Sequence, residues 1–362
     1  MKITIHKDQL IGPLTPVFNV IDKRASMPIL SHIYIEAGEQ ITLTATDLEI
    51  QIKAQIDIQA DQHGTACLPA EKFFNIIKSL PPDAKIKIST TDEKTIITAG
   101  RSRFTLNGLP SSNYPEFLCQ TEHQITLPEA VLKKSLEKTQ FCMAVLDARY
   151  YLNGLLINIA DRQYQTVASD GHRLAFFKSD IDSDIQTRII LPSKSVQQLF
   201  KLIDTSDNLI TLQFSRTHCI VQCQNIEFSS KLIDANYPDF SKVFAKDFHP
   251  EIQIDTDQLK TALQRAAILS NQQLRGLRLS LDQSELTIRS NNLEADEAEE
   301  PLEIDGFNSQ LDICFKSNYL IDALSHIDSI KANLKIASDE STCLVQDTLD
   351  DSFEFIVMPM RL

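Results

Sequence analysis

The chain has 362 residues, of which 43% are hydrophobic and 23% charged, a composition typical of folded proteins that excludes disordered and collagen-like classes. At ~150 residues per domain, this length predicts two or three domains. The formal net charge of -14, from 35 basic and 49 acidic side chains, argues against an outer surface that attracts nucleic acid.

The longest apolar run, residues 355–360, is far shorter than the ~20 residues of a membrane-spanning helix. The amino-terminal segment also lacks the apolar core of a signal peptide. We therefore expect a cytoplasmic protein with no membrane partner. The seven cysteines form no CxxC pair and have no histidine at metal-ligand spacing, which predicts buried, reduced thiols and no metal site.

The predicted elements, taken in chain order, repeat about every 123 residues. Each copy opens with a short alternating strand that leads into a helix, at residues 3–10, 125–132 and 252–259. Strand-like, β-branched segments follow this first helix in every copy, and they start 122 and then 123 residues apart. The first helix of each copy carries a leucine pair spaced i, i+4: Leu10 and Leu14, Leu132 and Leu136, and Leu259 and Leu263.

A second helix in each copy gives the clearest evidence of the repeat. Its four apolar positions are spaced i, i+3, i+4, i+7, which predicts one apolar stripe per helix, beginning at Phe73, Val196 and Leu320. Between the copies, SNYPEF at 112–117 recurs as ANYPDF at 235–240. The repeat predicts three α+β domains, each with two helices packed on antiparallel sheets, at residues 1–122, 123–249 and 250–362. Alternatively, the repeat reflects gene duplication alone, and the arrangement of its copies has no role in function.

The number of helices limits what such a repeat could enclose, because packed helices stand ~8 to 10 Å apart and are ~10 to 12 Å thick. A ring of six helices from one chain would leave a hole of only ~9 Å, too narrow for a duplex. Twelve helices from two chains would leave ~28 Å, wide enough for B-form DNA. A ring around DNA therefore requires a homodimer.

The charge distribution supports a lining made of helices. The predicted helical segments are residues 7–20, 70–80, 128–145, 193–203, 256–269 and 316–330, and together they carry a charge of +4. Because the whole chain carries -14, the remaining residues carry -18. Lys194 and Lys201 lie opposite the apolar stripe of their helix and are candidate DNA contacts. Other cations of the segments add to the count: Lys133, Lys134, Lys138, Lys260 and Arg265. Ordinary solvated helix faces would give the same pattern.

Several motifs carry a family resemblance that runs essentially from end to end. They are MPIL (27–30), ARYYLNGLL (148–156), ASDGHRLA (168–175), ANYPDF (235–240) and the terminal VMPMRL (357–362). In these motifs the chain resembles the bacterial DNA polymerase III beta subunits, which are DNA sliding clamps. The resemblance implies three similar domains per chain and a head-to-tail dimeric ring, with helices inside and sheets outside.

The resemblance also implies the partners. They are duplex DNA, bound without regard to sequence, the DNA polymerase III alpha subunit, the clamp-loader complex, and other polymerases and repair proteins that carry short clamp-binding peptides. A closed ring retains DNA by topology, so weak phosphate contacts suffice, and a negative exterior keeps DNA off the outside. Arg24, Tyr150 and Tyr151 match family positions that touch DNA. Instead of touching DNA, Arg24 could be an ordinary solvated loop cation, and the two tyrosines could be a half-buried pair at the start of a strand.

A cleft between the second and third domains is implied as the binding site for partner peptides. Unbranched, polarizable methionines with proline and aliphatic neighbours suit a pocket that accepts several different peptides. Its expected residues are Leu152, Ser169, Gly171, His172, Arg173, Leu174, Pro238, Lys242, Val243, Ile356, Met358, Pro359, Met360, Arg361 and Leu362. Alternatively, the terminal motif is only the last edge strand of a sheet and binds no peptide.

Ring closure requires a heterologous interface between the first domain of one chain and the third domain of the other. Residues 294–300 hold five carboxylates, while the first repeat supplies cations, so the two ends are complementary. The candidate charged residues are Lys72, Arg101, Arg103, Glu294, Glu297, Glu299 and Glu300. The resemblance places Phe104, Ile268 and Leu269 at the apolar centre. A solvated acidic loop is the alternative.

Ser169, Asp170 and His172 lie within four residues and suggest a hydrolase as a rival function. Neighbours along an extended strand point to opposite faces, however, and catalytic triads draw their members from separate elements. The sequence has no P-loop, dinucleotide-binding fingerprint or HExxH motif. We therefore expect no catalytic residues and no cofactor. A ring-forming scaffold that never encloses DNA is the second rival.

Overall fold

The computed structural model describes the chain except residues 23–25, 272–274, 283, 305–310, 338–341 and 361–362. Within this described part, six α-helices and four antiparallel sheets form two compact units. Unit 1 comprises Met1–Lys133 and Lys194–Asp234, and unit 2 comprises Lys134–Ser193 and Ala235–Leu362. The middle repeat is therefore divided between the units, each of which combines it with one terminal repeat.

Unit 1 contains two sheets. Their orders are β1, β6, β7, β8 and β5, β2, β3, β4, β16, β15, β14, β9. Its elements are β1 (Lys2–His6), α1 (Lys7–Asn19), β2 (His32–Ala37), β3 (Ile41–Thr46), β4 (Ile50–Ile56), β5 (Gly64–Pro69), α2 (Ala70–Ser79), β6 (Lys85–Thr91), β7 (Lys94–Ala99), β8 (Ser102–Asn107), β9 (His123–Pro128), α4 (Ser193–Leu202), β14 (Leu209–Phe214), β15 (His218–Cys223) and β16 (Ile226–Lys231).

Unit 2 repeats this arrangement with sheets of order β13, β10, β11, β12, β24, β23, β22, β17 and β20, β19, β18, β21. Its elements are α3 (Glu129–Thr139), which begins in unit 1, β10 (Gly154–Ala160), β11 (Gln163–Ser169), β12 (Arg173–Asp180), β13 (Thr187–Pro192), β17 (Phe248–Asp255), α5 (Thr256–Ile268), β18 (Gly276–Asp282), β19 (Glu285–Asn291), β20 (Glu297–Glu303), β21 (Leu311–Lys316), α6 (Ser317–Leu324), β22 (Lys331–Ala337), β23 (Cys343–Asp347) and β24 (Phe353–Val357).

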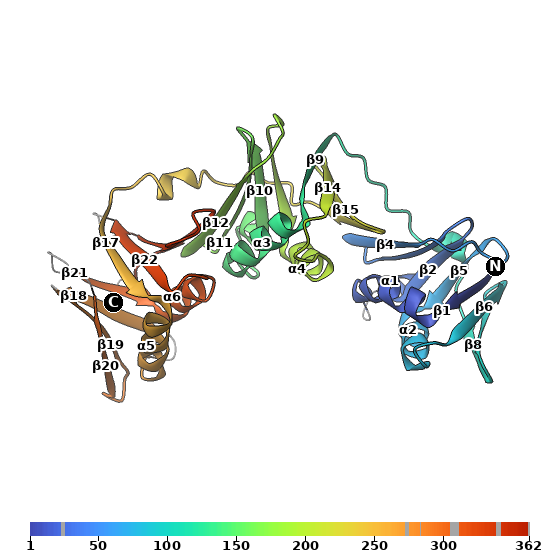
Figure 1. Cartoon of the computed structure of the whole chain (residues 1–362), viewed down its shortest axis with the longest axis horizontal. Coiled ribbons are helices and arrows are strands. Elements are labelled where there is room, and N and C mark those ends of the chain that lie inside the picture. The colour runs from blue at the N-terminus through green and yellow to red at the C-terminus, as the bar shows by residue number, and fades with distance from the viewer. Residues whose placement is uncertain (23–25, 272–274, 283, 305–310, 338–341, 361–362) are drawn as a thin grey trace. The chain divides into compact units, whose positions relative to one another are not determined.

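The helices pack through the apolar stripes that the sequence predicts. Within unit 1, α1 packs on β3 and β4, and α2 packs on β2 and β5 of the same sheet (Figure 1). Leu14 of α1 and Phe73 of α2 are fully buried. Of the twelve stripe residues on the second helices, ten are buried, and Ile76 and Phe200 are half-buried. Because burial follows the i, i+3, i+4, i+7 spacing, the predicted second helices and their buried faces are confirmed.

Two helices are shorter than the sequence predicts. The expected helix at 128–145 ends at Thr139 and continues as the 3-10 helix Gln140–Cys142, and the expected helix at 316–330 ends at Leu324. At this second end, Ser325 Oγ donates to the Ile321 carbonyl at 2.7 Å. Side chains that bond the last carbonyls in this way compete with further helical turns.

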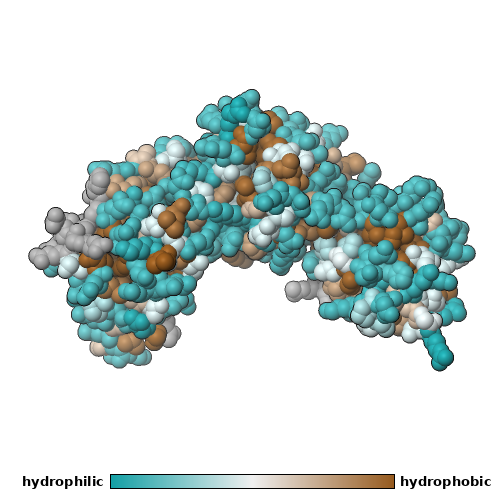
Figure 2. Space-filling model, viewed as in Figure 1, coloured by the Kyte–Doolittle hydropathy of each residue, from teal (hydrophilic) through white to brown (hydrophobic). Residues whose placement is uncertain are grey.

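The surface and interior fit a folded protein with reduced thiols. The face seen in Figure 2 is largely hydrophilic, with apolar residues in separate patches. All seven cysteines are free thiols, five of them buried. Among the described residues, no helix is long and apolar enough to cross a membrane. In the same part of the chain, no group of three or more His, Cys, Asp or Glu side chains could hold a metal ion.

Candidate functional site

The ASDGHRLA motif forms a tight turn between β11 and β12 of unit 2. Ser169 Oγ donates to the Arg173 carbonyl at 2.8 Å and accepts the Gly171 N–H at 3.0 Å. The Asp170 carboxylate accepts the N–H groups of His172 and Arg173 at 2.9 and 3.0 Å. Gly171 has a φ of +88°, a left-handed conformation that favours glycine. Ser169 and Asp170 thus hold the turn, and their geometry is not that of a catalytic triad.

Arg173 ties this turn to two neighbouring elements. Its Nε donates to Asp170 at 3.1 Å, its Nη1 pairs with Asp322 of α6, and its Nη2 donates to the Phe141 carbonyl at 2.9 Å. The guanidinium also lies 4.7 Å from the Tyr319 ring centroid. With its side chain only 14% exposed, Arg173 orders the surroundings of the turn. Its contact with a partner peptide stays a prediction.

The terminal motif lies beside the same turn. In the ladder between β12 and β24, Leu174 pairs with Ile356, and both side chains are buried. Beyond β24, Met358 N donates to the His172 carbonyl at 2.8 Å and Met360 N donates to the Cys314 carbonyl at 2.7 Å. Residues 358–360 are half-buried. The segment therefore runs from the turn to β21 with its methionines partly accessible.

The ANYPDF motif also reaches this region of unit 2. The Tyr237 ring meets the Tyr151 ring edge-on with centroids 6.0 Å apart, and Phe240 packs against Phe176 at 5.8 Å. Pro238 and Lys242 are exposed, Val243 is half-buried, and Leu152, in the 3-10 helix Tyr150–Asn153, is buried. The aromatic residues of this motif thus contact Tyr151 and β12, while the roles of Pro238, Lys242 and Val243 stay predictions. Arg361 and Leu362 lie outside the described residues.

Sequence reasoning missed Tyr319 and Lys316. The Tyr319 ring stacks on His172 with centroids 6.4 Å apart, and Lys316 Nζ lies 4.9 Å from the Tyr319 centroid. Tyr319 immediately precedes the apolar stripe of its helix. The sequence therefore predicts that it lies on a packed helix but does not predict its contact with His172. Their position next to His172 adds an aromatic and a cationic group to the cleft candidates.

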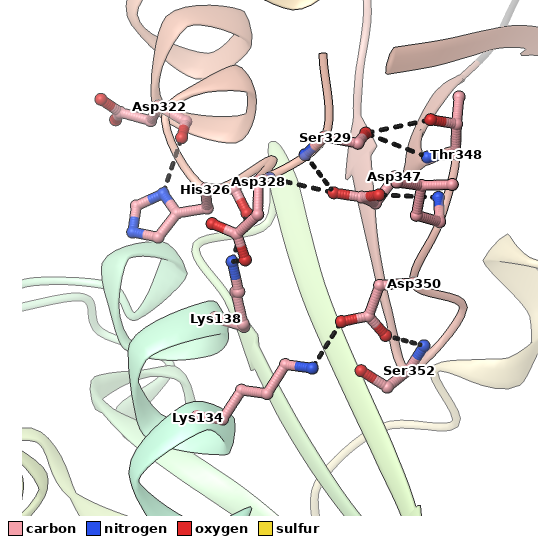
Figure 3. A network of polar contacts seen from close by, with 11 residues as sticks. Lys134, Lys138, Asp322, His326, Asp328, Ser329, Asp347, Thr348, Asp350 and Ser352 are labelled. Atoms are coloured by element: carbon pink, nitrogen blue, oxygen red, sulfur yellow. Dashed lines mark hydrogen bonds and ion pairs between the residues drawn. The ribbon is translucent and has the colours of Figure 1, made fainter. Parts of the chain in front are cut away.

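A polar network stands where α3 meets the end of α6 and the turn before β24 (Figure 3). Lys138, with its side chain 4% exposed, donates to the His326 carbonyl at 2.6 Å and to Asp328 Oδ2 at 2.7 Å. Lys134 pairs with Asp350 nearby. Burial lowers the pKa of His326, whose Nδ1 donates to the Asp322 carbonyl at 2.8 Å. Since Asp322 also binds Arg173, the network continues to the candidate cleft.

The candidate DNA contacts are in different environments. Tyr150 is 59% exposed, whereas Tyr151 is half-buried against Tyr237. Lys201 is exposed on α4, and Lys194 pairs with Asp47 and lies 3.9 Å from Glu49. Arg24 lies outside the described residues. Their contact with DNA stays a prediction, but the charge of Lys194 is already partly neutralised within unit 1.

Several cations of the helical segments are engaged within the chain, so the summed charge of these segments overstates the charge available to DNA. Lys138 is buried, and Lys133 donates from Nζ to the carbonyls of Phe200 and Ile203 at 2.5 and 3.0 Å, where it caps α4. Arg265 donates to Glu300 at 2.8 Å. Sequence charge alone does not separate a cation that caps a helix from one that faces solvent, because both occupy polar helix positions.

The candidate interface residues lie on two sheet edges and their surroundings. On β8, Arg103 is exposed and Phe104 is half-buried, and Lys72 on α2 and Arg101 before β8 are exposed. Ile268 at the end of α5 is 77% exposed, and Leu269 is half-buried. Glu294 and Glu297 are exposed, whereas Glu299 pairs with Arg289 at 2.9 Å and Glu300 with Arg265. Two of the four carboxylates are therefore engaged within the chain.

Three sequence profiles match the chain, described as the N-terminal, central and C-terminal domains of DNA polymerase III beta subunit, at residues 1–118, 126–239 and 241–361. The beta sliding clamp of Escherichia coli K12 is 35% identical and the alignment covers 100% of both chains. The crystal structure of DNA polymerase III subunit beta from Pseudomonas aeruginosa matches all of both chains with a TM-score of 0.97 at 34% identity. A second structure from that organism, a sliding clamp bound to griselimycin, has a TM-score of 0.96 at 34% identity and the same full coverage.

Proposed function

The chain belongs to the DNA polymerase III beta subunit family, and on this basis we propose that it is a DNA sliding clamp. Two copies, with clamp domains at 1–122, 123–249 and 250–362, join head to tail into a cytoplasmic ring around duplex DNA. The ring tethers the replicative polymerase and other DNA-processing proteins through the cleft in unit 2. It acts as an accessory subunit without catalytic residues of its own.

The observation that carries this proposal is how repeats join within the chain. In unit 1, β4 of the first repeat pairs with β16, and in unit 2, β12 of the second repeat pairs with β24. Each junction sets a phenylalanine opposite a smaller apolar residue: Phe228 opposite Ile52, and Phe355 opposite Ala175. Both phenylalanines are buried, with 0% and 1% of their surface exposed. Each repeat therefore offers the same edge to its neighbour.

The two ends of the chain carry the halves of a third such junction. β8 and β20 have the equivalent places in the repeat, but each lies at the edge of a four-stranded sheet. The repeat offset of 124 residues makes Phe104 the counterpart of Phe228, and an offset of 123 makes Ala298 the counterpart of Ala175. Pairing β8 of one copy with β20 of another would bury the half-buried Phe104 and complete a sheet of eight strands.

The register of that pairing favours a heterologous junction. With Phe104 opposite Ala298, the adjacent pair in an antiparallel ladder is Arg103 opposite Glu299. Self-pairing of β20 would instead set carboxylates against carboxylates, which is unfavourable. A dimer has two β8–β20 junctions, so the assembly closes into a ring and leaves no edge free.

A topological assay tests the proposed function. The protein is loaded onto a nicked circular plasmid by a clamp-loader complex, and the plasmid is then cut once. Because a ring is held by topology, we expect the protein to stay on circles and to leave linear DNA, and we expect no loading onto closed circles without the loader. Equal retention on circular and linear DNA would mean ordinary affinity and would refute the proposal. A ring-forming scaffold that does not enclose DNA would bind neither form.

A further inference from the structure

A cavity of about 730 Å³ lies in unit 1, on the face of the eight-stranded sheet opposite α1. Strand alternation separates the two faces of β4: Ile52 is buried on the side of α1, whereas Gln51 and Lys53 point to the other side and line the cavity. From β16, the cavity is lined by Glu227 and Ser229. It therefore spans the junction of the first two repeats, and we call it the junction pocket.

Residues 114–119, between β8 and β9, form an aromatic wall of the junction pocket. The Tyr114 ring stacks on Tyr34 of β2 with centroids 5.2 Å apart, and the Phe117 ring meets His218 of β15 edge-on at 5.9 Å. These two contacts hold the segment against the sheet. Leu118, beside Phe117, is 71% exposed and also lines the pocket. The wall thus offers apolar surface that is in place before a ligand binds.

The floor of the junction pocket is polar although it is buried. Gln51 is 4% exposed and Thr44 is 6% exposed, and no hydrogen bond joins either side chain to another described residue. A buried polar group without a partner is costly, so such groups are normally completed by water or by a ligand. The Gln51 amide offers both donors and an acceptor, which a second amide group can satisfy together.

The equivalent position in unit 2 has an apolar floor. In the ladder between β4 and β16, Gln51 pairs with Ser229, and in the ladder between β12 and β24, Leu174 pairs with Ile356. Each pair adjoins the buried phenylalanine of its junction, so the two pairs are equivalent. An aliphatic ligand side chain over Gln51 would leave the amide unpaired. The two junctions therefore select ligands of different polarity.

The charges that line the junction pocket disfavour an anionic ligand. Lys53 Nζ lies 3.4 Å from Glu227 Oε1, so the ammonium group is paired within the pocket. Glu36 and Glu116 also line the pocket, and both are exposed. Three carboxylates with one ammonium group repel phosphates. Nucleic acid is thus disfavoured, and a neutral or basic ligand fits.

We propose that the junction pocket binds an extended peptide segment of a partner protein. Side-chain amides of glutamine or asparagine lie on the floor against Gln51, an apolar neighbour packs on the wall beside Leu118, and a basic residue lies toward Glu36 and Glu116. The cavity volume is within the ~300 to 1,000 Å³ of ordinary ligand sites. The pocket lies in unit 1, so this inference goes beyond the proposed function and does not depend on the cleft of unit 2.

The test uses the full-length protein and two pools of acetylated hexapeptide amides. Both pools have mixed Lys, Leu and Ser at the outer positions, and the two central residues are Gln in one pool and Leu in the other. Cys119 lines the pocket and is half-buried, so a bound peptide should slow its reaction with N-ethylmaleimide. We expect the glutamine pool to protect Cys119 at a concentration ~10-fold lower than the leucine pool.

Gln51→Leu separates ligand binding from folding. Because the amide has no partner among the described residues, the variant should melt at the wild-type temperature or above it, yet protection by the glutamine pool should weaken at least ~10-fold. Gln222→Leu is the matched control, since Gln222 is exposed on the same face of β15 but does not line the pocket. It should change neither property. Thr44→Val gives the same test of the floor if Gln51→Leu does not fold.

Three results would overturn the peptide assignment. They are equal protection of Cys119 by the two pools, unchanged protection in the folded Gln51→Leu or Thr44→Val variant, and better protection by a single-stranded oligonucleotide than by the glutamine pool. None of these measurements involves a DNA ring or the unit 2 cleft. Failure of the topological assay would therefore count against the clamp function alone, and failure of the protection assay against the junction pocket alone.

Discussion

Replacing Lys138 with methionine removes the ammonium group that joins α3 to the segment after α6 while keeping a long apolar side chain. The variant loses a charged hydrogen bond to the His326 carbonyl at 2.6 Å and an ion pair with Asp328. It also loses the contact of Nζ with the Phe353 ring, 4.4 Å from the centroid. The Asp328 side chain is 74% exposed, so it regains water and limits the loss.

From these terms we expect a local destabilisation of about 2 kcal/mol. A hydrogen bond from a charged donor contributes ~1.5 to 3 kcal/mol, and a desolvated cation–π contact adds about 1 to 2. Relief of the cost of burying an ammonium offsets part of the sum. Lys134→Met is the matched control, because Lys134 is 38% exposed in its pair with Asp350. That partly exposed pair should contribute less than about 1 kcal/mol.

Hydrogen exchange in the full-length protein measures this difference. In Lys138→Met, amides of β24 and the end of α3 that exchange by local opening should exchange ~30-fold faster than in the wild-type protein. Removal of a neighbouring positive charge should also raise the pKa of His326, which Lys138 helps to lower. Exchange rates equal to those of Lys134→Met, or an unchanged His326 titration, would refute a structural role for the buried lysine.

Three further predictions concern the ring and the thiols. Leu269→Lys places a charge at the proposed apolar centre of the interface and should give monomers in sedimentation; a dimeric variant would count against this interface. Arg103→Glu should weaken dimerisation about tenfold or more, and Glu299→Arg in the same chain should restore it if the predicted register is right; failure of this rescue would contradict the register. Burial raises the pKa of Cys343 to about 12, so this thiol stays protonated at pH 8, and mass spectrometry after alkylation should show it modified much more slowly than the half-buried Cys119; equal rates would disprove its burial.

The sequence alone is sufficient to predict the kinds of elements and their threefold order. Spacings of i, i+3, i+4, i+7 report a helix with one buried face, because helical geometry places those positions together wherever the helix packs. Leu199 and Leu324 are buried as this periodicity predicts. The recurrence of SNYPEF as ANYPDF likewise identifies the repeat without any knowledge of contacts.

Tertiary structure decides what each polar or strained residue does. Lys138 and Lys201 are both lysines of predicted helices, yet one is buried against residues about 190 positions away in the chain and the other is exposed. No local pattern encodes such a distant contact, since only folding brings Asp328 to Lys138. Leu48 and Gly171 lie at equivalent sequence positions with positive φ, yet Leu48 packs on an apolar cluster whereas the Arg149 guanidinium lies beside Gly171. Local periodicity therefore fixes the elements, while long-range packing fixes which surfaces remain free to bind.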